Sequence, residues 1–358
     1  MDLLENQAYI NSLKAISRLD FLSGKTVLVS GASGMLGSCL VDAIMVWNRQ
    51  QAKPCRVIAV GRNQEAARRR FGCYWGNAHF MFIQQDVCKP LDTVSEHVDF
   101  IFHAASPADP VNMAKYPADT LLANVLGTKN LLEYGLAQGM ERFLFVSSGE
   151  AYGQPDENQD DFIEGYCGPL DLTSPRSCYP EGKRAAEVLC QSYRCQFGAD
   201  VVIVRPCHLF GPTMSRKDSR AVAEFLWAAA EGRDIVLKSD GLKERSHCYV
   251  TDAVQGLLVA LEKGESGQAY NIADRRYQMT IRVFAEQAAE AGGCKVVFDL
   301  PSDMESKGYS RVSRQVLCAD RLENLGWESS KLNNRVIEKT IQILKSCEDK
   351  IVSSELEK

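Results

Sequence analysis

Short apolar runs rich in β-branched and aromatic residues alternate with helix-like segments through the first two thirds of the chain. The first of them, residues 25–30, is uninterrupted, which is typical of a strand buried on both faces. The six runs lie at residues 25–30, 56–60, 80–87, 100–105, 142–148 and 201–206. Their alternation with helices predicts an α/β fold with a doubly wound parallel sheet.

The turn after the first run carries three glycines, Gly31, Gly34 and Gly37, in the spacing G-x-x-G-x-x-G. Such glycines allow a tight turn, close approach of the backbone to a pyrophosphate, and tight packing of helix on strand. The helix that follows offers unpaired N–H groups to an anion at its N-terminus. A strand, this turn and a helix in sequence predict a dinucleotide site, as in a Rossmann domain.

Tyr179 and Lys183 stand four residues apart at the start of an Ala-rich helix-like segment. Residues at this spacing share one face of a helix. A cation held beside a phenol favours the phenolate, so we expect Lys183 to lower the pKa of Tyr179 and make it a general base. Tyr-x-x-x-Lys alone is common, but here it accompanies the glycine turn and a strand that ends at Ser147 and Ser148.

The alternation of strands and helices becomes less regular after residue 210. Helix-like segments at 221–231 and 281–291 and short strand-like runs at 235–237 and 269–272 follow. We therefore expect three parts: an N-terminal accessory helix (1–22), a Rossmann domain that binds NAD(P) (23–210), and a smaller, mainly substrate-binding lobe with segments that cross back (211–358).

Composition and charge narrow the class of protein. The 358 residues are 45% hydrophobic and 24% charged, with a formal net charge of −5, which gives no reason to expect nucleic acid or an anionic membrane as partner. There is no apolar run of about 20 residues, as a membrane span requires, and no signal-peptide layout at the N-terminus. The 13 cysteines include no C-x-x-C pair. We expect reduced thiols, a cytoplasmic location and no metal.

These motifs, in this order, resemble the extended short-chain dehydrogenase/reductase family of nucleotide-sugar epimerases, dehydratases and decarboxylases. The resemblance extends from Lys25 to Trp327 and, within the family, is greatest to the UDP-glucuronate decarboxylases. The segments that carry it are His103–Ala108, Asn124–Thr128, Pro175–Arg184, Asp218–Val222 and Arg245–Asp252.

The resemblance implies that Ser148 and Tyr179 bind the C4 hydroxyl of a sugar and that Lys183 holds the nicotinamide ribose. Ser148, Glu150, Tyr179 and Lys183 are the predicted catalytic residues. The predicted cofactor-binding residues are Gly31, Ser33, Gly34, Met35, Leu36, Gly37, Arg62, Asp86, Val87, Ala104, Ala105, Ser106, Asn124, Ser147, Tyr179, Lys183 and Pro206. The predicted substrate-binding residues are Pro107, Glu150, Tyr152, Arg176, His208, Arg220, Lys238 and Arg245.

Residues Gly149 and Glu150 bear on the type of reaction. Glu150 occupies the position where the family's dehydratases and decarboxylases carry Glu, and typical 4-epimerases lack that acid. Dehydratases place an Asp immediately before it, as general acid, and Gly149 cannot donate a proton. The chain departs from the decarboxylases at His208, Lys238 and Thr213, where they have Asn, an aromatic residue and Arg; these departures permit another sugar or base.

The choice between NAD and NADP is predicted less directly by the residues than the dinucleotide site itself. Chains that bind NAD place Asp or Glu after the second strand, to hold the ribose 2′-hydroxyl. Here Gly61 and Arg62 stand there, and an arginine without an acid suits the 2′-phosphate of NADP. The family resemblance implies NAD, which we expect, with NADP as the alternative.

The predicted function is an NAD(P)-dependent enzyme acting on a nucleotide sugar, a UDP-glucuronate decarboxylase that forms UDP-xylose through a 4-keto intermediate. A nucleotide-hexose 4-epimerase and an NADPH-dependent ketosugar reductase are the alternatives within this class. A non-catalytic dinucleotide-sensing regulator is an alternative from another class, disfavoured because Ser148, Tyr179 and Lys183 are all present. A homodimer is expected.

Overall fold

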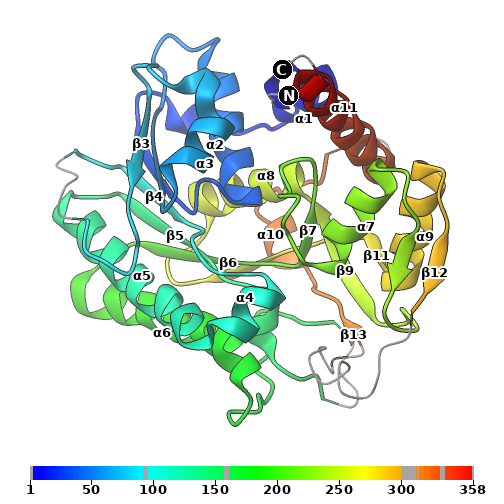
Figure 1. The fold of residues 1–358 in the computed structure, drawn as a ribbon. Coiled ribbons are helices and arrows are strands. Elements are labelled where there is room, and N and C mark those ends of the chain that lie inside the picture. The colour runs from blue at the N-terminus through cyan, green and yellow to red at the C-terminus, as the bar shows by residue number, and fades with distance from the viewer. Residues whose placement is uncertain are drawn as a thin grey trace.

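A seven-stranded parallel sheet lies at the centre of the molecule (Figure 1). The computed structural model describes residues 3–91, 96–156, 161–299, 312, 314–330 and 335–356. The strand order is β10-β6-β5-β4-β1-β2-β3, and every neighbouring pair is parallel. Their bounds are β1 (Thr26–Ser30), β2 (Arg56–Gly61), β3 (Phe80–Gln84), β4 (Phe100–His103), β5 (Arg142–Val146), β6 (Val201–Pro206) and β10 (Ala269–Ile272). The predicted doubly wound parallel sheet is confirmed.

Helices cover both faces of this sheet, which is why its strands are apolar throughout. In β1, Val27 and Val29 point to one core and Leu28 to the other, following the two-residue period of a strand. The first core includes side chains of α2 (Met35–Asn48) and α8 (Val250–Lys263), and the second those of α5 (Pro117–Ala137) and α6 (Cys178–Phe197). The shorter helices on this part of the chain are α3 (Gln64–Phe71) and α4 (Pro110–Lys115).

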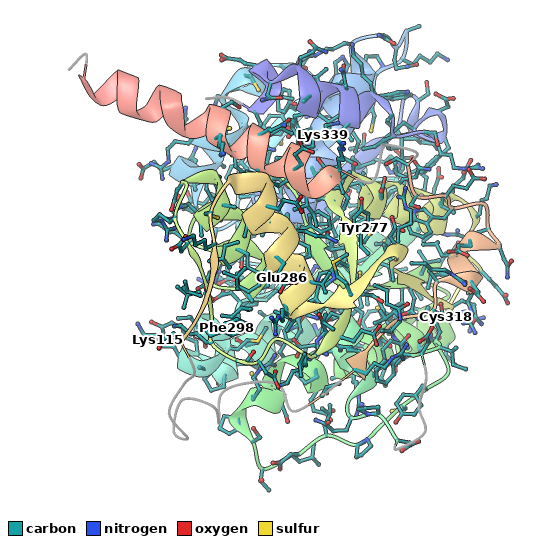
Figure 2. All side chains as sticks on the ribbon, turned by 90° about the vertical axis from the view of Figure 1, so that its right-hand side faces the viewer. Lys115, Tyr277, Glu286, Phe298, Cys318 and Lys339 are labelled. Atoms are coloured by element: carbon teal, nitrogen blue, oxygen red, sulfur yellow. The ribbon has the colours of Figure 1, made fainter. Side chains whose placement is uncertain are left out.

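A second cluster of elements packs around Phe210, Tyr249 and Phe284. Figure 2 shows α11 lying across α9, which carries Glu286. The strands are β7 (His208–Phe210), β8 (Ile235–Leu237), β9 (Glu244–Tyr249), β11 (Asp274–Thr280), β12 (Val296–Phe298) and β13 (Arg314–Gln315); the helices are α7 (Ala221–Ala230), α9 (Ile281–Gly292) and α11 (Val336–Leu356). The short helix α10 (Asp320–Glu323) instead packs on the main sheet, where Leu322 is part of the first core. β10 and α8 follow residue 210 in the chain, yet they lie in and on the main sheet.

The N-terminal segment differs from the single helix predicted over residues 1–22. The helix α1 spans only Gln7–Lys14. Asn6 caps its start, accepting from the backbone N–H of Ala8 at 2.9 Å. Beyond its end the chain turns at Arg18, whose φ of 62° is incompatible with a right-handed helix. The separate 3-10 turns are Leu3–Glu5 and Asp20–Leu22.

Helix α1, near the N-terminus, lies beside α11, the last helix of the chain (Figure 1). The Tyr9 hydroxyl donates to Asp42 of α2 at 2.7 Å. The Asn6 side chain donates to Ser346 of α11 at 2.9 Å. Thus α1 packs between the first helix of the main sheet and the last helix of the chain. Among the described residues, no helix combines the length and apolar character that crossing a membrane would require.

A buried histidine makes stability depend on pH. His103 at the end of β4 is 1% exposed, and burial lowers its pKa to about 3. The unfolded chain, with an ordinary histidine pKa near ~6.5, therefore binds a proton that the folded protein does not bind between about pH 6 and 4. The free energy of unfolding is therefore unaffected by His103 well above its ordinary pKa, and it decreases as the pH falls and the unfolded chain takes up this proton.

We expect His103→Gln to reduce the slope of unfolding free energy against pH, between pH 6 and 4, by about 1.4 kcal/mol per pH unit. Urea unfolding at several pH values measures this slope. A loss of stability that is the same at every pH leaves the slope unchanged. His79→Gln, at a partly exposed position, is the control. An unchanged slope in the His103 variant would contradict the prediction.

Candidate active site

The predicted Tyr179 and Lys183 pair lies at the carboxyl end of β5. Both residues are in the first two turns of α6, and both are buried, with exposed fractions of 6% and 2%. The Lys183 ammonium donates to the carbonyl of Val146, the last residue of β5, at 2.7 Å. Its Nζ lies 5.7 Å from the centroid of the Tyr179 ring. The helix and the strand end therefore come together as predicted.

The predicted effect of Lys183 on Tyr179 is wrong in this structure. Burial raises the pKa of Tyr179 to about 12, and the negative charge of Glu150 acts in the same direction. A hydrogen bond with Ser148 and the charges of Arg220 and Arg176 oppose this rise. Burial also lowers the pKa of Lys183 to about 7, so the ammonium is itself disfavoured. At neutral pH Tyr179 is therefore a phenol when no ligand is bound.

Ser148 immediately precedes the 3-10 turn Gly149–Tyr152 that follows β5, and Glu150 lies within this turn. The Ser148 hydroxyl caps this turn, accepting from the Glu150 backbone N–H at 3.1 Å. The Glu150 carboxylate accepts from Nη2 of Arg176 at 2.9 and 2.8 Å. Arg176 lies in the turn Pro175–Ser177 just before α6. The ion pair thus joins the turn after β5 to the turn just before α6, the helix that carries Tyr179.

Behind these residues lies a charged network that the sequence analysis missed. Ser147 donates to Glu187 at 2.5 Å, and Glu187 also accepts from Arg205 of β6 at 2.9 and 2.6 Å. Glu187 follows Lys183 by four residues, so the helical spacing that relates Tyr179 to Lys183 would have found it. We regard Ser147 as part of this network, which fixes the chain immediately before Ser148.

Close packing within the protein requires glycine at two positions of the predicted dinucleotide turn. Gly31 has a φ of 66°, and a Cβ there would lie 2.7 Å from the backbone nitrogen of Ala105. A Cβ on Gly37 would lie 2.5 Å from the Gly31 carbonyl oxygen. Gly34 precedes α2 without a side-chain cap, so the first N–H groups of that helix remain available to an anion. Ser33, Met35 and Leu36 complete this segment.

The other predicted cofactor residues follow the ends of neighbouring strands. Ala104, Ala105 and Ser106 come after β4, with Pro107 next; Asp86 and Val87 follow β3, Arg62 follows β2, and Pro206 ends β6. Asn124 comes from α5 and is fully buried. Its Oδ1 atom and the Ser106 hydroxyl are buried without a hydrogen-bond partner among the described residues. Unpaired buried polar atoms of this kind indicate a place for a ligand.

Four of the eight predicted substrate-binding residues come from the chain after β6, namely His208, Arg220, Lys238 and Arg245. His208 starts β7 and Arg245 is in β9, which pairs with it. Burial lowers the pKa of His208 to about 3, and the charges of Arg245 and Arg220 act in the same direction. The charge of Arg220 also opposes the rise in the pKa of Tyr179. Arg220 forms an ion pair with Asp218 at 2.5 Å. Lys238 is exposed after β8, and no hydrogen bond or ion pair joins it to these residues in the described part of the chain.

Two residues have structural contacts that the sequence did not predict. Tyr152 is fully buried, stacks on Phe162 at 5.0 Å and donates to Asn271 at 2.7 Å; its role in substrate binding stays a prediction. Arg184 pairs with Glu181 at 3.4 Å and also donates to the carbonyls of Ala151 and Gly168, both at 2.7 Å. It therefore anchors the loop between β5 and α6.

Comparison with known proteins gives relatives over most of the chain. UDP-glucuronic acid decarboxylase 6 of Arabidopsis thaliana is 36% identical over 248 residues, which are 69% of either chain. UDP-glucuronic acid decarboxylase 1 of Xenopus tropicalis is 36% identical over 68% of this chain, and the match spans only 55% of the relative's own length.

Solved structures share the fold at lower identity. UDP-glucuronic acid 4-epimerase from Bacillus cereus, in complex with UDP-glucuronic acid and NAD, has a TM-score of 0.76 and 21% identity, covering 90% of this chain and 99% of its own. The dTDP-glucose 4,6-dehydratase DesIV from Streptomyces venezuelae, with NAD bound, has a TM-score of 0.75 and 22% identity, covering 90% and 97%. The model of the NAD dependent epimerase/dehydratase family matches residues 27–273. The chain therefore belongs to the NAD dependent epimerase/dehydratase family.

Proposed function

We propose that this chain is an NAD-dependent UDP-glucuronate decarboxylase that forms UDP-xylose through a 4-keto intermediate. The observation that carries the proposal is the placement of Glu150, paired with Arg176, beside Ser148 and Tyr179. Gly149 supplies no acid for expelling a hydroxyl, which disfavours dehydration. The relatives of about one-third identity that bear the name UDP-glucuronic acid decarboxylase support the same reaction.

The residues at the sheet edge fit NAD. The turn from Gly31 to Gly37 packs tightly against the protein and leads into a helix N-terminus without a side-chain cap, whose N–H groups suit a pyrophosphate. Asn124 and Ser106 offer unpaired buried polar atoms. In this proposal Asp86 and Val87 border the adenine, and Lys183 holds the nicotinamide ribose. When bound, NAD supplies a hydride acceptor and a positively charged ring.

Tyr179 and Ser148 act at the C4 hydroxyl of the sugar. Ser148 polarises the oxygen, and Tyr179 takes the proton as C4 is oxidised to a ketone. The positive ring of the bound cofactor favours the phenolate that burial alone disfavours. The ketone lies β to the C5 carboxylate, so the electrons of the breaking carbon–carbon bond can pass to its oxygen while carbon dioxide leaves. A proton then adds at C5, and Tyr179 returns its proton to the C4 oxygen as the ketone is reduced.

Incubation with UDP-glucuronate and NAD tests the function. We expect a UDP-pentose and carbon dioxide by mass spectrometry, with no net accumulation of reduced cofactor because the hydride is returned. UDP-glucose, which lacks the carboxylate, is the control and yields at most a 4-keto species. A galacto epimer without loss of carbon dioxide would instead establish the 4-epimerase alternative.

Substitution of Arg62 tests whether this residue favours binding of NADP over NAD. It is exposed after β2, and no acidic residue stands next to it where NAD-binding chains carry one. We expect Arg62→Ala to weaken NADP binding by about tenfold through loss of a charged partner for the 2′-phosphate, and to leave NAD binding unchanged. Fluorescence titration of both cofactors measures this. Equal losses for NAD and NADP would assign Arg62 to the adenine or to the fold.

Arg220 and Arg245 would bind the UDP end in this proposal, since guanidinium groups match phosphate oxygens.

A homodimer and a cytoplasmic location remain predictions. Sedimentation velocity of the purified chain measures the oligomeric state directly.

A further inference from the structure

The ion pair between Arg176 and Glu150 uses only part of the arginine. A single nitrogen, Nη2, donates to both carboxylate oxygens, at 2.9 and 2.8 Å. The other guanidinium nitrogens, Nη1 and Nε, make no hydrogen bond to any residue that the structure describes. The two side chains are 36% and 32% exposed, so the pair can be reached from solvent. Arg176 thus has N–H donors for a second acceptor.

The place of this ion pair in the site indicates which part of the substrate it would contact. Both charges act on the Tyr179 phenol, in opposite directions. They therefore lie within electrostatic reach of the group that acts at C4 of the sugar in the proposed function. In a uronate the carboxylate is attached to C5, the carbon next to C4. If the sugar is bound with C4 at Tyr179, a carboxylate on C5 would lie near Arg176 and Glu150.

We infer that Arg176 binds the C5 carboxylate of the substrate with the N–H groups that Glu150 leaves unused, and so selects uronates over neutral hexoses. The inference rests on the proposed function. Without the guanidinium, the substrate carboxylate and Glu150 would be two like charges side by side. An arginine can serve two carboxylates because its donors are spread over a planar fork, whereas lysine carries one compact charge.

Contacts other than the ion pair hold the segment that carries Arg176. The Ser174 hydroxyl accepts from the Arg176 backbone N–H at 3.3 Å. The Ser177 hydroxyl donates to the Asp171 carbonyl at 2.6 Å. Removal of the guanidinium alone should therefore change the local charge and leave the backbone before α6 in place.

Binding of two ligands to matched variants tests the inference. All proteins carry Tyr179→Phe, so that the ligand is not consumed, and contain NAD. We expect Arg176→Met to weaken UDP-glucuronate by about 10–100-fold, the loss of a charged hydrogen bond, and UDP-glucose by less than about threefold. Adding Glu150→Gln to Arg176→Met should restore UDP-glucuronate binding by about tenfold, because one of the two facing charges is removed. Isothermal titration calorimetry gives the affinities.

Arg184→Met is the matched control, since Arg184 anchors the loop through the carbonyls of Ala151 and Gly168. It should change both ligands by the same factor. Equal losses of both ligands in Arg176→Met, or unchanged UDP-glucuronate binding, would overturn the inference. Selective loss of UDP-glucuronate binding would support it even if the parent enzyme released no carbon dioxide, a result that would remove only the decarboxylase proposal.

Discussion

Tyr179→Phe should lower turnover of UDP-glucuronate by about 10²–10⁴-fold, the range that a positioned acid–base group contributes. The phenol is the only proton carrier in contact with Ser148 that we place at the C4 oxygen. The ring itself is buried, 6% exposed, and Phe keeps its volume. The thermal midpoint should therefore change little while single-turnover rates of ketone formation fall.

Tyr193→Phe is the control for this substitution. Tyr193 lies on the same helix, and its hydroxyl donates to Glu133 at 3.1 Å, away from the strand end. Turnover of that variant should equal that of the parent protein. Parent-like turnover in the Tyr179 variant would remove the proposed mechanism, whatever the product of the enzyme.

Glu187→Ala should destabilise the fold by about 3–5 kcal/mol, because it leaves the Arg205 charge buried without its partner. The two side chains are only 11% and 13% exposed and lie 2.6 Å apart. Ser147 also loses its acceptor at 2.5 Å. We expect the midpoint of urea unfolding to decrease clearly. Activity should also decrease, because the chain before Ser148 is no longer held.

Glu181→Ala gives the comparison for an exposed pair on the same helix. Glu181 lies 3.4 Å from Arg184, with side chains 32% and 21% exposed, and such pairs contribute about 0.2–1 kcal/mol. If Glu187→Ala costs no more than Glu181→Ala, the Glu187–Arg205 pair is not a structural element of the site.

The strands were predictable because burial on both faces leaves a simple pattern. β1, β2 and β6 are uninterrupted apolar runs, and each was located to within a residue or two. Outside the regular alternation, α7, α9, β8 and β10 were also located, at residues 221–231, 281–291, 235–237 and 269–272. The helices α8 and α11, of 14 and 21 residues, were not predicted. The predicted N-terminal helix was too long, since the left-handed turn at Arg18 has no clear signal in an arginine.

The chemistry at the site was only partly predictable. Spacing on one helix showed that Tyr179 and Lys183 share a face, but the pKa of each depends on how far it is removed from water. The burial of Tyr152 against Phe162 was not predictable, because it depends on a contact with a residue outside the catalytic motifs. Glu150 and Arg176 are 26 residues apart, and only the folded loop brings them into contact.

The strand order of the main sheet has a consequence for how the chain is made. β1 is synthesised first and lies inside the sheet, with β2 and β3 added in turn on one side and β4, β5, β6 and β10 on the other. Each strand that leaves the ribosome can therefore join a free edge of the sheet already formed, and none has to be inserted between existing strands. The contact of Asn6 with Ser346, across 340 residues, becomes available only when synthesis of the chain is almost complete.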